Sequence, residues 1–132
     1  MLESAKQAVS YVQGQTFEQF WDDFKTRDAV AMRLTIIGEA ARQVSPETAA
    51  TMPQIPIHAM RGLRNRIAHT YDQVDFTEVW KITQHDLKPL ITELAKSLRA
   101  QEKAQILAQQ MREAHHLSSN PPRPKQGPRM GI

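Results

Sequence analysis

Apolar residues recur along this chain every three or four positions, which is the spacing that places them on one face of an α-helix. We find no segment with a convincing strand-type alternation of apolar and polar residues. The strongest helical pattern runs from Asp28 to Gln43, with Val30, Leu34, Ile37 and Ala41 on its apolar face. The sequence therefore predicts an all-α protein.

Capping residues divide this pattern into separate helices. A first helix should end at Gly14, and Thr16 can cap a short second helix. Ser45 can cap another helix, with Pro46 in its first turn. Asp75 can cap a long final helix, because Glu78 three positions later completes a capping-box pattern. Within that final helix, Pro89 should cause a kink or an interruption.

Four aromatic residues recur at helical spacing near the start of the chain. They occupy positions i, i+3, i+4 and i+7 of one short segment: Phe17, Phe20, Trp21 and Phe24. Aromatic residues in this arrangement are typical of core packing, and a cofactor-binding motif is the alternative. We expect these four to anchor the core.

Length and composition limit the remaining possibilities. The 132 residues are enough for one domain, which we place at 1–116. The absence of cysteine excludes disulfides, Cys-ligated zinc and thiol nucleophiles. Since no apolar run could serve as a signal peptide or membrane span, we expect a cytoplasmic protein that does not contact a membrane. Residues 117–132 hold four of the eight prolines and three basic residues, and should form a disordered tail.

The segment Arg64-Asn65-Arg66-Ile67-Ala68-His69-Thr70-Tyr71 is the most informative for function. If one helix spans roughly 57–70, then Met60, Leu63 and Ile67 form a buried stripe. His69 would then lie about 150° or more from that stripe. A histidine that serves only packing would more naturally lie on the buried side. We therefore predict that His69 is a functional surface residue, with a merely solvated histidine as the alternative.

Basic residues gather around this histidine. Arg61, Arg64 and Arg66 lie in the stretch from Thr48 to Tyr71, which contains no Asp or Glu. Three positive charges without a nearby counter-charge favour a phosphate-bearing partner. We expect RNA binding to be supported by Asn65, Arg61, Arg66 and Tyr71. The alternatives are solvated charges for Arg61 and Arg66 and a core-closing role for Tyr71.

A histidine and an arginine can together cleave RNA without a metal ion or a cofactor. The ribose 2′-hydroxyl attacks the adjacent phosphorus, and an imidazole can transfer the protons because its pKa lies near neutrality. A guanidinium matches the charge that develops on the phosphoryl oxygens. We therefore predict that His69 transfers protons and that Arg64 stabilises this charge.

The spacing of these two residues also bears on assembly. Residues 64 and 69 would lie about 140° apart on one helix and could not easily meet at one phosphate. Two copies of the chain could combine their groups in one cleft. We therefore expect a homodimer, in which Gly62 lets the paired helices approach closely.

The motif R-x-x-x-x-H-x-Y, carried by Arg64, His69 and Tyr71, resembles that of the HEPN superfamily and specifically of the HepT-like ribonuclease toxins. The surrounding blocks strengthen the resemblance over about residues 5–98; they are 28–30, 33–40, 53–56, 60–65, 79–80 and 86–87. Ile57 departs from the family, which usually has tryptophan there. The resemblance implies an antiparallel helical bundle, a homodimer, and metal-independent RNA cleavage by Arg64 and His69.

The resemblance also implies a place in a toxin–antitoxin pair of type II or type VII character. The cognate antitoxin would be an MntA-like nucleotidyltransferase that transfers AMP onto Tyr71. The added bulk and phosphate charge would compete with RNA for the same arginines. The alternative function is a non-catalytic HEPN subunit that binds nucleotide or RNA, or that docks a nucleotidyltransferase.

Overall fold

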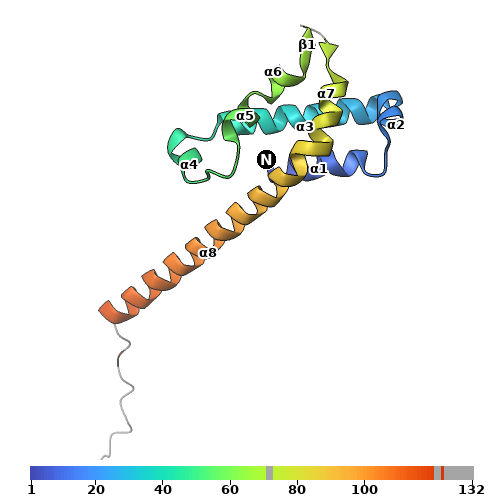
Figure 1. Ribbon diagram of the computed structural model, residues 1–132. Helices are drawn as coiled ribbons and strands as arrows, with labels where there is room; N and C mark the ends of the chain where they lie inside the picture. Colours follow the sequence, from blue (N-terminus) through green and yellow to red (C-terminus); the bar gives the residue numbers. More distant parts are fainter. Residues whose placement is uncertain (71–72, 121–122, 124–132) are drawn as a thin grey trace, which may run out of the picture. The chain divides into compact units, whose positions relative to one another are not determined.

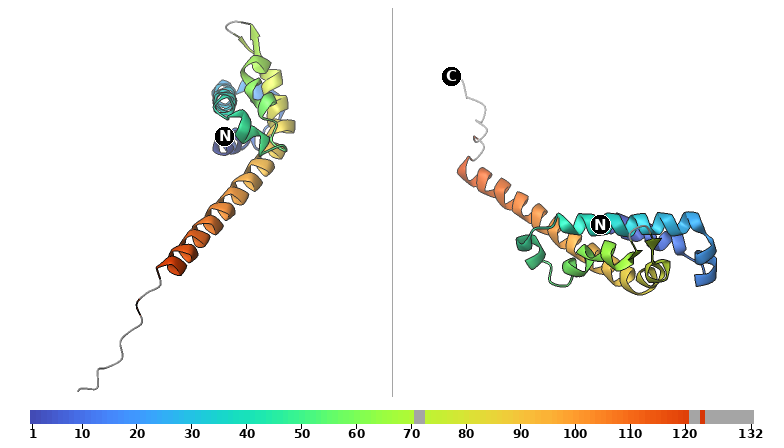
Figure 2. Two further views of the ribbon diagram at one scale, coloured as in Figure 1. Left: turned by 90° about the vertical axis from the view of Figure 1, so that its left-hand side faces the viewer. Right: turned by 90° about the horizontal axis from the view of Figure 1, so that it is seen from above.

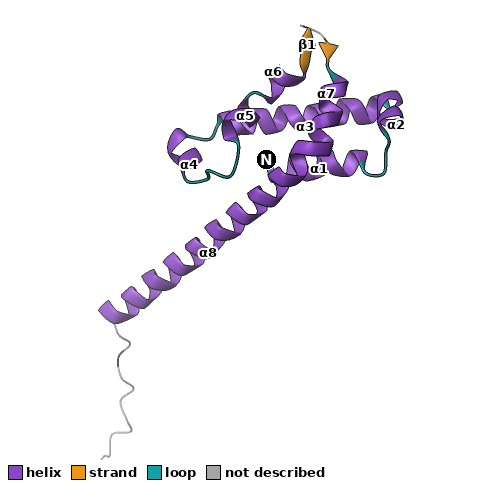
Figure 3. Ribbon diagram, in the orientation of Figure 1, coloured by secondary structure: helices purple, strands orange, loops and turns teal. Residues whose placement is uncertain are grey.

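The computed structural model describes residues 1–70, 73–120 and 123 (Figure 1). The chain forms two units, Met1–Ser97 and Leu98–Ile132. The all-α prediction is confirmed, since the described residues are helical apart from loops and one small hairpin (Figure 3). The elements are α1 (Leu2–Val12), α2 (Phe17–Asp22), α3 (Phe24–Arg42), α4 (Pro46–Ala50), α5 (Ile57–Arg61), α6 (Leu63–Ile67), β1 (Ala68–Thr70), β2 (Gln73–Val74), α7 (Phe76–Lys81), the π-helical turn η1 (Ile82–Asp86) and α8 (Leu87–Ser119).

Most of the predicted helix ends are confirmed. Gly14 follows α1 with a φ of 79°, a conformation that favours glycine. Thr16 forms a capping box with Gln19 at the start of α2. Ser45 accepts a hydrogen bond from the backbone of Thr48, and Asp75 caps α7 in the same way. These local signals set where the short helices begin.

The predicted start of α3 at Asp28 is wrong, because the helix begins at Phe24. Asp23 caps it by accepting hydrogen bonds from the Thr26 backbone N–H at 3.1 Å and the Thr26 hydroxyl at 2.6 Å. The bond from the Thr26 side chain, then that from its backbone, and then one from Gln15 lower the pKa of Asp23 below its ordinary value. The ionised carboxylate therefore holds the first turn of α3.

Helix α3 carries the central apolar face of the Met1–Ser97 unit. Its predicted face is confirmed, since Val30, Leu34, Ile37 and Ala41 are fully buried. It packs against α1 and also against α5 and α6; Figure 2 shows its place in two further views. A Cβ atom added at Gly38 would lie 3.3 Å from the Met60 carbonyl oxygen and 3.7 Å from the Leu63 Cβ. The close approach of helices therefore occurs at Gly38.

Only part of the aromatic prediction is confirmed. Phe20 is fully buried and packs against Trp80, with ring centroids 5.1 Å apart. Trp21 and Phe24 are 45% and 68% exposed, so they do not anchor the core. The four aromatic residues do not share one helix face, because α2 ends at Asp22 and a new helix starts at Phe24. The Arg27 guanidinium lies against Trp21, Phe24 and, at 3.9 Å from the ring centroid, Phe76.

The interruption expected at Pro89 occurs just before it, as the π-helical turn η1. In this turn the Leu87 N–H donates to the Ile82 carbonyl, five residues back instead of four. Helix α8 then runs through Pro89 to Ser119. Residues 117–119, predicted to be disordered, are therefore helical. The rest of the predicted tail lies outside the described residues, apart from Asn120 and Arg123.

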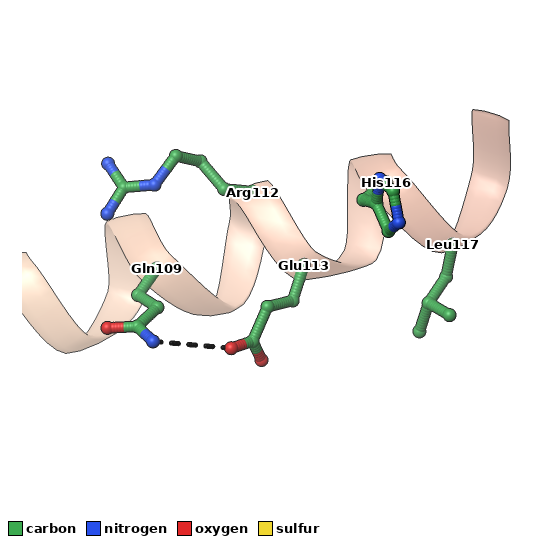
Figure 4. Close-up of a pocket in the computed structure, with 5 residues that line it drawn as sticks. All are labelled: Gln109, Arg112, Glu113, His116 and Leu117. Atoms are coloured by element: carbon green, nitrogen blue, oxygen red, sulfur yellow. Dashed lines mark hydrogen bonds between the residues drawn. The ribbon is translucent and has the colours of Figure 1, made fainter. Parts of the chain in front are cut away.

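The part of α8 in the second unit has an exposed surface. Five exposed side chains lie along one stretch of this helix: Gln109, Arg112, Glu113, His116 and Leu117 (Figure 4). Gln109 donates a 3.3 Å hydrogen bond to Glu113 within this stretch. Nowhere in the described part of the chain does a helix combine the length and apolar composition that a membrane crossing needs.

Candidate functional site

The sequence predicted one continuous helix for the motif. The structure instead divides this segment into two helices and a strand. Gly62 separates α5 from α6, and Ala68–Thr70 forms strand β1. This strand pairs antiparallel with β2, with Ala68 opposite Val74 and Thr70 opposite Gln73. His69 therefore lies on a hairpin, and the helical angles assigned to it do not apply (Figure 1). The geometric argument for a homodimer consequently loses its premise.

A long-range hydrogen bond explains why the helix stops. The Asp75 N–H donates to the Ile67 carbonyl at 2.6 Å, which joins the last residue of α6 to the cap of α7. That carbonyl would otherwise accept an N–H from the next helical turn. The chain between Ile67 and Asp75 turns back on itself instead, and forms β1 and β2.

The helical part of the motif has the predicted buried and exposed sides. Met60, Leu63 and Ile67 are 3–5% exposed and belong to the core. Arg64 and Asn65 are exposed on α6. Neither has a hydrogen-bond or ion-pair partner among the described side chains. Arg64 thus lies on a helix anchored by Leu63 and Ile67 and is itself exposed to solvent, as a residue that meets a ligand must be.

Arg61 is tied to the end of α3. Its Nε donates to the carbonyl oxygen of Ala41 at 3.1 Å, and its Nη2 donates to that of Val44 at 2.6 Å. Ala41 lies in the last turn of α3 and Val44 two residues beyond its end, where no following helical turn supplies N–H donors. Arg61 therefore has a structural role that its sequence position did not reveal.

Arg66 forms two ion pairs with residues distant in sequence. Its Nε donates to Glu78 Oε1 at 2.5 Å, and its Nη1 donates to Asp86 Oδ2 at 2.7 Å. Partial burial lowers the pKa of Arg66, but the bonds to Glu78 and Asp86 outweigh it and raise this pKa above its ordinary value. The stretch from Thr48 to Tyr71 has no acidic residue in sequence, but the fold brings two carboxylates from outside it to Arg66. The counter-charges come from α7 and η1, 12 and 20 residues further along.

Two predicted site residues cannot be placed in full. The backbone of His69 belongs to β1, but its side chain lies outside the described residues, as does Tyr71. Their roles stay predictions. In the described part of the chain, no group of three or more His, Asp or Glu side chains could hold a metal ion. The described site is thus α6 with Arg64, followed by the hairpin that carries His69.

Comparisons with known proteins identify relatives of the first unit. A family model described as "Ribonuclease HepT-like" matches residues 1–97. The "Probable ribonuclease HepT" of Thermococcus cleftensis is 33% identical, over 67% of this chain and 84% of that protein. The "Putative RNase MJ1380" of Methanocaldococcus jannaschii is 32% identical, over 71% of this chain and 86% of that protein. No solved structure matches. The family match ends at the residue where the first unit ends.

Proposed function

Because the chain belongs to the HepT-like ribonuclease family, we propose that it is a metal-independent endoribonuclease whose catalytic residues are Arg64 and His69. The observation that carries the proposal is the family match over residues 1–97, which includes the whole motif. The exposure of Arg64 on a helix that leads directly into the strand of His69 supports it.

The proposed reaction is an internal transesterification. His69 accepts the proton of the 2′-hydroxyl while its oxygen forms a bond to phosphorus, and the bond from phosphorus to the 5′-oxygen breaks. The proton accepted by His69 passes through water to that oxygen and gives a 5′-hydroxyl, and the other product ends in a 2′,3′-cyclic phosphate. Arg64 stabilises the charge on the non-bridging oxygens. Asn65, which is exposed on α6, orients the imidazole of His69 or holds a phosphate oxygen.

From the membership of the family alone, we further propose that the enzyme works as a homodimer and as the toxin of a toxin–antitoxin pair. The antitoxin is an MntA-like nucleotidyltransferase that attaches AMP to Tyr71. In sequence this tyrosine lies between β1 and β2, two residues after His69. A phosphate group attached there would compete with RNA for Arg64. Mass spectrometry of the co-expressed pair should find one added AMP, located on Tyr71.

The test of the cleavage activity uses purified protein and RNA in the presence of EDTA. We expect cleavage with a cyclic phosphate end, and a loss of about 100-fold or more for His69→Ala, because acid–base catalysis typically contributes that much. Arg64→Ala should lose a comparable factor. His115→Ala and Arg42→Ala are matched controls on exposed positions outside the site. Cleavage that His69→Ala leaves unchanged would refute the proposal, and salt-sensitive binding without product would favour the non-catalytic alternative.

A further inference from the structure

We propose that Arg66 is a positioning residue of the ribonuclease site, held by Glu78 and Asp86, and that it does not bind the RNA backbone. This inference rests on the proposed function. It differs from the sequence-based prediction, in which Arg66 supports RNA binding. The inference is based on the Arg66 guanidinium, which lies on the same helix α6 as Arg64. It binds two carboxylates, Glu78 of α7 and Asp86 of η1.

Helix α6 needs such support because it is too short to hold its own position. It has five residues, and isolated helices of that length do not form in water. On one side α3 contacts it at Gly38, where Leu63 and the Arg64 backbone lie within 4 Å of an added Cβ. On the other side Arg66 attaches it to α7 and η1 through side chains, in addition to the backbone bond between Asp75 and Ile67. Arg64 lies between these two attachments.

The π-helical turn explains how two carboxylates reach the same arginine. Residues eight positions apart on a regular α-helix differ by about 80° around the axis. The turn η1 adds one residue between Glu78 and Asp86, so they differ as residues seven apart do, by about 20°. Both carboxylates consequently face α6, and each takes a different nitrogen of Arg66.

The charge balance disfavours a role in binding phosphate. One guanidinium and two carboxylates give this cluster a net charge of −1. An incoming phosphate would meet this net negative charge, which opposes its binding even at the guanidinium N–H groups that Glu78 and Asp86 do not occupy. Arginine also suits the bridging role better than lysine, because its planar guanidinium can donate hydrogen bonds to two acceptors in fixed directions.

The same attachment determines the position of the hairpin. Ile67 at the end of α6 accepts the hydrogen bond from Asp75, which caps α7. Glu78 lies on the same helix α7 and binds Arg66. The two ends of the hairpin are therefore joined twice, once through backbone and once through side chains. A shift of α6 against α7 would move Arg64 and the strand of His69 relative to each other.

Kinetics of full-length variants can separate positioning from phosphate binding. We expect Arg66→Gln to lower kcat about 10- to 100-fold, since a displacement near 1 Å can cost that much. KM and its salt dependence should stay within about twofold of the wild-type values. Asp86→Asn is the decisive variant, because it removes one negative charge beside Arg66 and leaves only a weaker, neutral acceptor for its Nη1. Positioning predicts a lower kcat, whereas phosphate binding predicts a lower KM with kcat retained.

Matched controls and a second measurement complete the test. Arg42→Gln removes an exposed arginine, 3.8 Å from Glu39, and should leave kcat and KM unchanged. Hydrogen exchange at the Asp75 amide should be faster in Arg66→Gln and Asp86→Asn than in the wild type, at equal far-UV circular dichroism. An unchanged exchange rate would overturn the inference. This readout decides the positioning role even if the protein proves to have no ribonuclease activity, which would refute only the proposed function.

Discussion

Replacing Arg61 with alanine should weaken the fold while leaving RNA contacts intact. Arg61 donates two hydrogen bonds from a charged group to the carbonyls of Ala41 and Val44. A hydrogen bond from a charged group contributes about 1.5–3 kcal/mol. The released carbonyls can bind water, because Arg61 is only half-buried. We therefore expect Arg61→Ala to lower the free energy of unfolding by about 2 kcal/mol in total.

Urea unfolding followed by far-UV circular dichroism measures this loss directly. Arg61→Lys should lie between the wild type and alanine, since one ammonium cannot reach both carbonyls in the way that two guanidinium nitrogens do. Arg64→Ala is the matched control on the exposed side of the motif, and its stability should stay within about 0.5 kcal/mol of the wild type. If Arg61→Ala changes stability as little as Arg64→Ala does, the capping role is refuted. A smaller salt dependence of RNA binding in Arg61→Ala would instead support the sequence-based assignment.

Three further perturbations follow from the fold. Because Asp23 has a lowered pKa in the folded state, its stabilising effect is present above its ordinary pKa of 3.8 and is lost as the pH falls below it. Acid unfolding of Asp23→Asn should therefore be less steep than that of the wild type. Leu34→Ala, at a fully buried position, should cost about 2–5 kcal/mol in a denaturant titration. A chain ending at Ser97 should keep its cooperative thermal transition, because every core residue lies before that point; loss of that transition would show that the second unit is needed for folding.

The sequence predicted those features of the fold that depend on neighbouring residues. The helix caps are an example: their hydrogen bonds reach only three residues ahead, so a short stretch of sequence is enough to predict them. They are Thr16, Ser45 and Asp75. The pattern places the start of α3 at Asp28 because Val30, the first residue of the apolar face, follows it closely, whereas the actual cap, Asp23, lies seven residues before Val30. Local patterns thus identified the helices better than their starting points.

The site was less predictable, because contacts between distant residues determine it. The buried stripe through Leu63 and Ile67 and the exposure of Arg64 follow from helical spacing, and the structure confirms them. The end of α6 depends on the hydrogen bond from Asp75 to Ile67, which no local sequence pattern predicts. The partners of Arg66 depend in addition on the inserted residue of η1. The roles of His69 and Tyr71 stay predictions.

The tight passage of α3 beside α5 and α6 makes the two glycines of this region unequal in their tolerance of mutation. At Gly38 even a methyl group would press on the Met60 carbonyl at 3.3 Å, whereas at Gly62 the nearest atom would be 3.5 Å away, an ordinary contact. A library of random variants screened for loss of the folded protein should thus contain many destabilising changes at codon 38 and few at codon 62. Such a screen would locate the contact of α3 with α5 and α6 from genetic data alone.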